Sequence, residues 1–300
     1  MLTFEFIDPD EQIGSADFHF VERFLETTGR AEIGWHYITD LTWIYSRVKN
    51  WPRTHRILDA GGGSGPLQFL LAELGFHVTN IDMVLPDPAT AHEERYRLTR
   101  RRLVHVTETG YAGHLRRFMF PDATSRLKRI YRATRAMLRR ARGGRSRLDA
   151  GARDPSVGTI EWIVGNLCDL REIPEGTFDA VVSLSALEHI PVEQLGDALS
   201  ELARVSKPDA GWAVTTSGTE QAATWLHGPS QGWCYSLADL KDRFGAVGAR
   251  PQDPAEMLER YRGCTYLREH LAAFYRRTER CGMPWGIWDP RYIPVGLSRG

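Results

Sequence analysis

The sequence predicts an α/β protein with a doubly wound, mostly parallel sheet and helices on both faces. Three observations predict this fold. A short apolar run, Ile57-Leu58, leads into an acidic residue, a glycine cluster and then a helix. A second strand, His77–Ile81, follows that helix and ends in Asp82. Further along the chain, the apolar run Phe178–Leu184 is typical of a strand that is buried on both faces of a parallel sheet.

The segment Arg56–Asp82 is central to this prediction. Pro66 stands where a helix would begin, which is a position that proline favours, and Gly75 ends the helix. Between them, four leucines recur at helical spacing. They are Leu67, Leu70, Leu71 and Leu74. A strand, a glycine loop, a helix and a second strand that ends in an acid, in this order, are typical of the first part of a nucleotide-binding fold.

The positions of the glycines indicate which nucleotide the loop would bind. A dinucleotide site needs a third glycine where this chain has Pro66, so the sequence disfavours NAD. The pattern that fits is acid-x-Gly-x-Gly-x-Gly on Asp59, Gly61, Gly63 and Gly65. It resembles motif I of the class I S-adenosylmethionine (SAM)-dependent methyltransferases. The alternative is a glycine-rich turn in an unrelated α/β protein, which the agreement between strand, loop, helix and acid disfavours.

The second half of the chain is similar to the same family. Gly165-Asn166 resembles the strand end that meets the adenine, and Phe178–Ile190 resembles the segment around the fourth strand. Lys207–Gly211 resembles the turn before the fifth strand, and Tyr292–Leu297 would be the antiparallel last strand. The resemblance therefore implies a Rossmann-like, seven-stranded sheet and SAM as the cofactor, with S-adenosylhomocysteine (SAH) as its product. The expected cofactor-binding residues are Asp59, Gly61, Gly62, Gly63, Gly65, Asp82, Met83, Asn166, Leu167, Ser183 and Tyr37.

We expect one domain over residues 1–300. It would consist of an N-terminal helical cap (1–55), a core (56–85 and 159–300) and a basic, largely helical insertion (86–158). In the cap, Trp35-His36-Tyr37 either folds over the SAM site or belongs to a helix that covers a sheet edge. Further helices are expected over Ile33–Val48, Val192–Val205, Leu237–Phe244 and Pro254–Arg280, and Ala246–Gly248 would only end the third of these.

The insertion concentrates positive charge. Residues 92–154 hold 18 Lys and Arg against six Asp and Glu, although the whole chain has a net charge of zero. Ser125–Arg142 is expected to be a helix with arginines along one flank. Three interpretations remain open: a solvated lid, a surface for an anionic substrate or anionic lipid headgroups, and a nucleic-acid surface. Sparse aromatic residues disfavour the last of these.

Composition indicates the compartment. The four cysteines include no CxxC pair, which favours a reducing cytoplasm and argues against a structural zinc site. No apolar run approaches the roughly 18 residues of a membrane span, and the acidic start does not resemble a signal peptide. We therefore expect a cytoplasmic protein, with peripheral contact at the inner membrane face through residues 125–142 as an added hypothesis.

Two histidines are candidate catalytic residues. His189 follows the fourth strand, and its ordinary pKa of about 6.5 suits a general base, although such a histidine can also serve only to shape the pocket. His227 lies in Glu220–Tyr235, where Trp225, Trp233 and Tyr235 would form an aromatic wall or merely be buried. Glu188 would pair with a cation or with the base. The sequence shows no carboxylate set typical of a magnesium site.

Motifs that the sequence lacks narrow the class of methyl acceptor. Ser183–Ala186 stands where methyltransferases of exocyclic amines in nucleic acids carry an Asp/Asn-Pro-Pro-aromatic tetrad, and no Pro-Cys nucleophile is present. We therefore expect transfer to an oxygen of a polar, and by the charge of the insertion anionic, small molecule or glycan. The alternatives are a nucleic-acid methyltransferase and a binding module without catalysis. The intact glycine loop and Asp82 argue against the module. The oligomeric state is not predicted.

Overall fold

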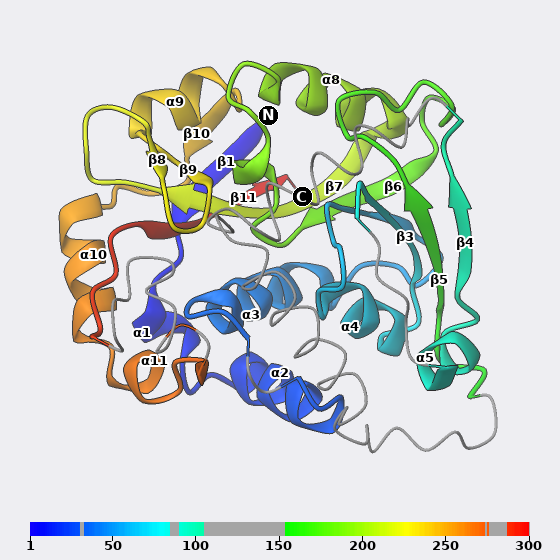
Figure 1. Cartoon of the computed structure of the whole chain (residues 1–300), viewed down its shortest axis with the longest axis horizontal. Coiled ribbons are helices and arrows are strands. Elements are labelled where there is room, and N and C mark those ends of the chain that lie inside the picture. The colour runs from blue at the N-terminus through cyan, green and yellow to red at the C-terminus, as the bar shows by residue number, and fades with distance from the viewer. Residues whose placement is uncertain (31–32, 85–89, 105–153, 274, 276–286, 300) are drawn as a thin grey trace, which may run out of the picture.

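The computed structural model describes residues 1–30, 33–84, 90–104, 154–273, 275 and 287–299 (Figure 1). In these ranges an eleven-stranded sheet has the order β10-β1-β11-β7-β6-β2-β3-β5-β4, with β9 paired to β7 and β8 to β9. All neighbouring strands are parallel except that β11 is antiparallel to β1 and β7, and β8 to β9. The strands are β1 (Leu2–Phe6), β2 (Arg56–Ala60), β3 (His77–Asp82), β4 (Thr99–Arg102), β5 (Thr159–Val164), β6 (Phe178–Ser183), β7 (Ser206–Gly218), β8 (Trp225–His227), β9 (Gly232–Tyr235), β10 (Ala246–Gly248) and β11 (Ile293–Arg299).

Helices cover both faces of this sheet. Figure 1 shows α3 and α4 on one face and α8 and α9 on the other. The helices are α1 (Pro9–Gln12), α2 (Ala16–Thr27), α3 (Tyr37–Val48), α4 (Leu67–Glu73), α5 (Thr90–Arg95), α8 (Leu195–Val205), α9 (Leu237–Asp242), α10 (Pro254–Gly263) and α11 (Thr265–Glu269), with a short 3-10 helix at Leu187–His189. The predicted α/β class with a mostly parallel sheet is therefore confirmed.

The sheet has more strands than the seven expected. Residues 1–55 were expected to be helical, but β1 lies between β10 and β11. Ala246–Gly248 was expected only to end a helix, but it forms β10 and pairs with β1. The loop Glu220–Tyr235 contains the hairpin β8–β9. β1 and β10 gain their hydrogen bonds from partners far away in the chain, which local sequence patterns do not show.

Two other local predictions were wrong. The helix expected over Pro254–Arg280 is interrupted at Cys264, whose extended backbone (φ −68°, ψ 104°) separates α10 from α11. The turn expected at Lys207–Gly211 lies inside β7. Phe178 pairs with Ser206 and Ala180 with Gly211, so the extra residues of β7 bulge out of register with β6.

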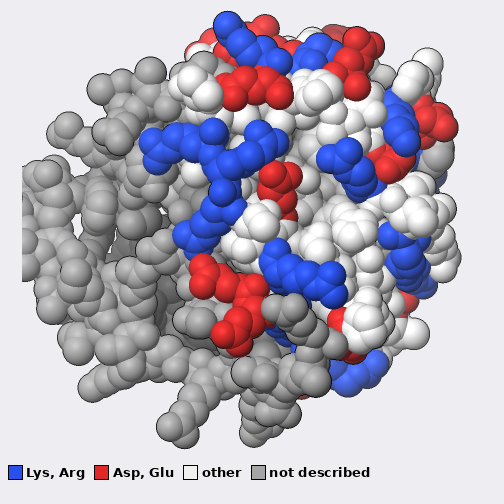
Figure 2. Space-filling view, turned by 90° about the vertical axis from the view of Figure 1, so that its right-hand side faces the viewer, with Lys and Arg blue, Asp and Glu red and all other residues white. Residues whose placement is uncertain are grey.

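Part of the predicted insertion belongs to the sheet. Residues 90–102 form α5 and β4, and β4 extends the sheet as its edge strand next to β5. Here the positive charges are largely paired, with Arg95 on Glu73 at 2.6 Å and Arg101 on Glu161 at 2.8 Å. Figure 2 views this edge and shows basic and acidic side chains interspersed. The helix expected over 125–142 lies outside the described residues.

The N-terminal cap is joined to the sheet by α3. Trp43 packs against Gly296 of β11, where a Cβ atom would overlap the indole ring. The indole Nε1–H of Trp43 donates to Glu5 Oε1 of β1 at 2.7 Å. The cap therefore packs on the same strands that carry both chain ends. In the described ranges, no helix is both long and apolar enough to cross a bilayer.

Candidate functional site

The parallel strands β2, β3, β5, β6 and β7 all end at the same edge of the sheet. The connection reverses between β2 and β6, because β3 and β5 lie on one side of β2 and β7 lies beyond β6. Open α/β sheets bind ligands outside the carboxyl ends of their strands at such a reversal. The Ser183 hydroxyl donates to the Ala60 carbonyl across this point at 2.7 Å, so its hydrogen is already committed to the backbone.

The glycine loop lies at the end of β2. Gly61 and Gly63 have φ values of +76° and +47°, a region that side chains disfavour. A Cβ at Gly61 would lie 2.6 Å from the Cβ of Ala186, in the turn after β6. A Cβ at Gly62 would overlap the carboxylate of Asp59, and one at Gly65 would lie 2.9 Å from the Gly62 carbonyl oxygen. The loop is therefore packed too tightly for side chains at these positions.

Asp59 lies beneath this loop and is fully buried. In the described part of the chain, neither of its carboxylate oxygens has a hydrogen-bond partner. Burial raises the pKa of Asp59 to about 8, and the nearby charge of Asp82 adds to the rise. The structure thus places this acid under the backbone of Gly62, on the inner side of the loop.

The loop is held from below by polar side chains that sequence analysis missed. Gln68 of α4 donates to the Gly63 carbonyl at 3.1 Å, and Asn80 of β3 donates to the same oxygen at 3.0 Å. Asn80 also donates to Gln68 Oε1 at 3.0 Å, and the indole of Trp162 donates to that oxygen too. A glutamine within the apolar helix α4 and an asparagine within the apolar strand β3 were the available signals.

Asp82 stands at the end of β3, opposite the glycine loop. Its Oδ1 accepts from the backbone N–H of Val84 at 2.7 Å, which holds the side chain in place. A Cβ at Gly63 would lie 3.4 Å from Oδ2, so the loop and the acid form the two sides of a narrow cradle. This cradle and the unpartnered carboxylate beneath it fit a ligand with ribose hydroxyls and an amino-acid-like part, as SAM has. The half-buried Met83 follows directly.

Three other predicted cofactor residues lie after β5 and at the start of α3. Leu167 follows β5, and its Cδ1 lies 3.8 Å from the Cβ position of Gly61. Asn166 uses its Oδ1 to accept from the N–H of Cys168 at 3.0 Å. Tyr37 begins α3, and its ring packs edge-on against His36, with 4.8 Å between centroids. Leu167 thus contacts the loop region directly, whereas Tyr37 belongs to the cap.

His189 lies against the turn of the β8–β9 hairpin, and His227 is the last residue of β8. Nδ1 of His189 is 3.2 Å from the carbonyl oxygen of Gln231, which can only accept, so this nitrogen carries the hydrogen. His227 is 3 % exposed, and its Nδ1 bonds Ser230 Oγ at 2.7 Å. Burial lowers the pKa of His227 to about 4, and the charge of Arg291 lowers it further. His227 is therefore neutral at pH 7.

In the predicted aromatic wall, Tyr235 is buried, whereas Trp225 and Trp233 are half-buried. Tyr235 and Cys234 are buried in β9, and the ring of Trp225 packs edge-on against His227, with 5.7 Å between centroids. His227 in turn contacts Tyr292, whose hydroxyl accepts from the indole of Trp35 at 2.8 Å. These contacts bring Trp35 of the cap to the hairpin region.

A second polar group of the cap reaches the same edge. His36 Nδ1 lies 2.9 Å from Asp40 Oδ2, and the Ser185 hydroxyl donates to that oxygen at 2.6 Å. The backbone N–H of Ser185 donates to Thr215 Oγ1 of β7 at 3.0 Å. Glu188 lies three residues after Ser185 and is 3 % exposed; burial raises its pKa to about 8, and the charge of Asp40 adds to this. The i, i+4 spacing of His36 and Asp40 was the signal for this pair.

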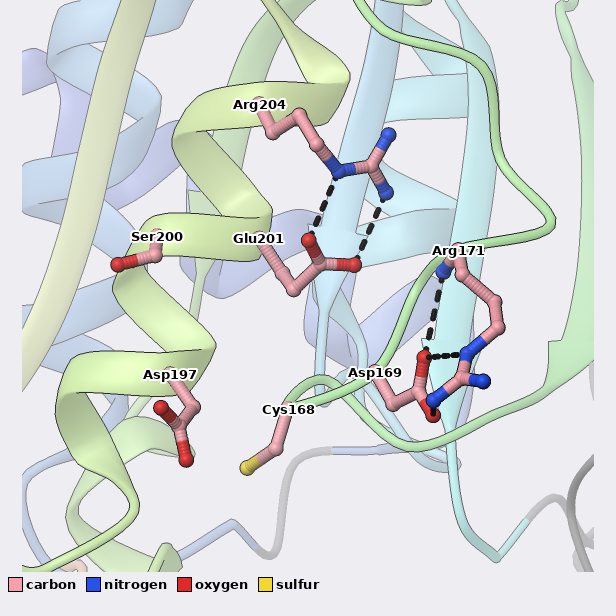
Figure 3. Close-up of a pocket in the computed structure, with 7 residues that line it drawn as sticks. All are labelled: Cys168, Asp169, Arg171, Asp197, Ser200, Glu201 and Arg204. Atoms are coloured by element: carbon pink, nitrogen blue, oxygen red, sulfur yellow. Dashed lines mark hydrogen bonds and ion pairs between the residues drawn. The ribbon is translucent and has the colours of Figure 1, made fainter.

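A cavity of about 610 Å³ lies apart from these side chains, between α8 and the loop after β5 (Figure 3). Arg171 pairs with Asp169 at 2.7 Å, and Arg204 pairs with Glu201 at 2.7 Å. Burial, followed by the charges of Asp197 and Asp169, raises the pKa of the Cys168 thiol. The arginines that line this cavity are thus already paired and its thiol is protonated, so we assign it no function. Among the described residues, no group of His, Cys, Asp and Glu could hold a metal ion.

Comparison with known families gives a match over part of the chain. Residues 133–214 match the model of a family described as a methyltransferase domain. The chain carries a methyltransferase domain. The matched residues include β5, β6 and α8, whereas the glycine loop precedes them. The predicted resemblance to class I SAM-dependent methyltransferases is confirmed, and with it the predicted enzyme class and SAM as the cofactor.

Three solved structures show distant similarity to this methyltransferase. A Burkholderia thailandensis 1,6-didemethyltoxoflavin-N1-methyltransferase, crystallised with 1,6-didemethyltoxoflavin and SAH, is 14 % identical (97 % of this chain, 89 % of that chain, TM-score 0.43). The [4+2]-cyclase SpnF is 16 % identical (90 % and 84 %, TM-score 0.47). The YcgJ protein from Bacillus subtilis is 14 % identical (86 % and 96 %, TM-score 0.40). A search of curated protein sequences found no match.

Proposed function

We propose that this methyltransferase transfers the methyl group of SAM to an oxygen of a polar or anionic small molecule or glycan, with His189 as the general base. The observation that carries the proposal is the cradle between the glycine loop and Asp82. It lies at the same sheet edge as the turn after β6, and Gly61 of the loop would touch Ala186 of that turn. Cofactor and acceptor would therefore meet beside the residues that follow β6.

The cofactor would be held from two sides. The backbone of Gly61–Gly65 would approach the amino-acid part of SAM, and Asp82 would accept hydrogen bonds from the ribose hydroxyls. The segment Asn166–Leu167 is the candidate for the adenine end, with Met83 beside Asp82. Ser183 would act indirectly, because its hydroxyl already bonds Ala60. Bound SAM supplies an activated methyl group on a sulfonium, so the protein's part is mainly alignment and exclusion of water.

The geometry of His189 supports its role as a base. Because its Nδ1–H donates to the Gln231 carbonyl, Nε2 carries the lone pair that can accept a proton from an acceptor hydroxyl. His227 is the weaker candidate, since it is buried and its pKa is lowered to about 4. We therefore propose His227 as a residue that positions the acceptor and His189 as the one that removes its proton.

Four further parts of the proposal rest on sequence. The anionic character of the acceptor and peripheral contact with an anionic membrane both depend on the basic residues 86–158, of which 86–89 and 105–153 are not described. The division into one domain with a cap, a core and an insertion, and a cytoplasmic location, belong to the same proposal. Within the described part, the pairing of Arg95 and Arg101 with acids weakens the case for a broad anion-binding surface.

The proposal is tested by identifying the acceptor. Purified protein is incubated with methyl-labelled SAM and a cell lysate, which is then split into small-molecule, lipid-glycan, nucleic-acid and protein fractions. We expect label in one of the first two fractions, in a product whose methyl sits on oxygen. Label that disappears with nuclease would instead make the protein a nucleic-acid methyltransferase. SAM binding without any labelled product would favour a binding module.

His189 is tested once the acceptor is isolated. We expect His189→Gln to lower kcat by about 10²–10⁴-fold, the usual contribution of a general base, with an unchanged dissociation constant for SAM. The acidic limb of the kcat profile against pH should disappear with it. An unchanged profile would leave His189 with a purely structural role beside Gln231.

A further inference from the structure

Buried polar atoms without hydrogen-bond partners gather at two places in the described ranges. Of ten such side-chain atoms, three belong to Asp59 and Asn80 under the glycine loop. Five lie at the ends of β6 and β7, in the cap and in the hairpin. They are Asp40 Oδ1, Glu188 Oε2, Thr216 Oγ1, His227 Nε2 and Tyr235 OH. Thr216 lies close enough to Glu188 for hydrogen bonding to lower its pKa, so these two residues interact with each other. Folded proteins pair nearly all buried polar groups, so the atoms of Asp40, His227 and Tyr235 that stay unpaired beside them indicate a ligand that pairs them.

Contacts around Gly232 show that these side chains form one group. A Cβ at Gly232 would lie 3.2 Å from Glu188 Cγ and 3.3 Å from Ser230 Oγ, and Ser230 Oγ bonds His227 Nδ1. The carboxylate of Asp40 raises the pKa of Glu188 further, and Glu188 in turn raises that of Tyr235. Polar groups of the N-terminal cap, of the turn after β6 and of the β8–β9 hairpin thus lie in one region.

The chemistry of this group suits a ligand that carries hydroxyls. A carboxylate oxygen accepts hydrogen bonds, and Asp40 has one oxygen left after those to His36 and Ser185. Glu188 accepts from the Ser217 hydroxyl at 3.5 Å through Oε1, which leaves Oε2. His227 is neutral, and Arg291 near it is paired with Asp289 at 2.9 Å. The raised pKa of Glu188 keeps it protonated at pH 7, so it can donate as well as accept a hydrogen bond. The group therefore offers the Asp40 carboxylate, a carboxylic acid and neutral dipoles to a ligand.

We propose that Asp40, Glu188 and His227 recognise the part of the acceptor that becomes methylated, and that this part is an uncharged, hydroxyl-bearing group such as a sugar ring. A carboxylate or phosphate at this place would face the Asp40 carboxylate and could donate no hydrogen bond to it. Neighbouring hydroxyls can donate to Asp40 and Glu188 and accept from Tyr235. The inference rests on the proposed function and narrows it: any anionic part of the acceptor lies away from the methylated ring.

The first test separates a ligand-binding role of Glu188 from a structural one. Glu188→Gln keeps the shape and cannot ionise. We expect its melting temperature to exceed that of the wild type by a few degrees more at pH 9 than at pH 6, because the wild type loses stability as the pH rises from the ordinary pKa of Glu188 to its raised pKa in the folded protein. The dissociation constant for SAM should stay within twofold, and methyl transfer from labelled SAM to the lysate acceptor should fall at least tenfold. The matched control is Glu193→Gln, an exposed residue, which should change none of these.

Two results would overturn the proposal. A lower melting temperature of Glu188→Gln at both pH values would show that Glu188 is a structural residue with protein partners. Undiminished methyl transfer would show that it does not contact the acceptor. If the wild type labels nothing but binds SAM, the proposed function fails, whereas the melting temperatures still decide whether Glu188 is structural.

The second test addresses the acceptor itself. The labelled product is hydrolysed, and the fragment that carries the label is separated by charge. We expect a neutral O-methylated fragment. Label on a fragment whose own ring bears a carboxylate or phosphate would contradict the proposal, although the proposed methyltransferase function would stand.

Discussion

The hydroxyl of Ser185 donates a hydrogen bond of 2.6 Å to the carboxylate of Asp40. Asp40 lies on α3 of the N-terminal cap, and Ser185 lies in the turn after β6, where its φ of +46° is unusual for a residue with a side chain. Such backbone strain persists only where surrounding contacts hold it, and it is frequent near functional sites. This bond therefore joins the cap to the edge of the sheet where cofactor and acceptor are proposed to meet.

Removal of the Asp82 carboxylate should weaken cofactor binding. Asp82→Ala removes the proposed acceptor for two ribose hydroxyls, and we expect SAH to bind more weakly by about 2–3 kcal/mol in calorimetric titration. The control is Asp242→Ala, an exposed residue on α9, for which affinity should not change. Equal affinity of wild type and Asp82→Ala would exclude Asp82 from the cofactor site.

A side chain at Gly62 should strain the loop through Asp59. Because its Cβ would overlap the Asp59 carboxylate, Gly62→Ala should lower the free energy of unfolding by about 1–3 kcal/mol. In an Asp59→Ala background the same change should cost much less, since the overlapping atoms are gone. Gly228→Ala is the control, because its Cβ meets nothing within 4 Å. Equal costs in both backgrounds would show that the two residues do not interact.

Gln68 should support the glycine loop. Gln68→Leu leaves the Trp162 indole without its acceptor and the Gly63 carbonyl with one donor fewer, so the free energy of unfolding should fall by about 2–3 kcal/mol. SAH affinity should fall as well, because the loop is no longer held. The same substitution at the exposed Gln221 is the control for urea unfolding and titration. Unchanged SAH affinity would mean that the loop keeps its shape without Gln68.

The stability of the ligand-free protein should fall as the pH rises. The pKa of Asp59 and that of Glu188 are both about 8 in the folded protein, against 3.8 and 4.5 as the ordinary values. A raised acid pKa contributes stability at low pH that is lost as the pH rises through the folded pKa. Asp82 faces Asp59, and Asp40 and Tyr235 face Glu188.

Urea unfolding at pH 6 and pH 9 measures this loss. We expect a lower free energy of unfolding at pH 9, and a smaller difference between the two pH values in Asp59→Asn and in Glu188→Gln. Acids with lowered pKa, such as Asp179, are ionised at both pH values and do not contribute to the difference. A free energy that stays constant or rises from pH 6 to pH 9 would contradict the prediction.

Sequence patterns predicted the core of the fold because that core is built from local signals. The strand before Asp59, the helix after Pro66 and the strand ending in Asp82 each carry their own hydrophobic period and end signal, and all three form as expected. The same holds for α9, whose N-cap Ser236 accepts from the N–H of Asp239 at 3.2 Å. The roles of the predicted site residues stay predictions.

The residues that sequence analysis missed act through long-range contacts. Gln68, Asn80 and Trp162 come from three separate elements and meet only under the loop. Asp40 and Ser185 are 145 positions apart, and β1 gains its partners from the far end of the chain. Hydrophobic periodicity does not reveal these tertiary contacts. Each polar residue, considered alone, is compatible with an ordinary solvent-facing or core position.

The sequence by itself determined the α/β class, the glycine loop and its acid, and the methyltransferase family, since each depends on residues close together in the chain. Only the tertiary structure decided that Asp59 lies beneath the loop, that the cap contributes a strand, and that Asp40, Glu188 and His227 share one buried region. The physical reason is burial. A side chain's charge state and free hydrogen-bonding atoms depend on what surrounds it in the folded protein, and those neighbours come from distant parts of the chain.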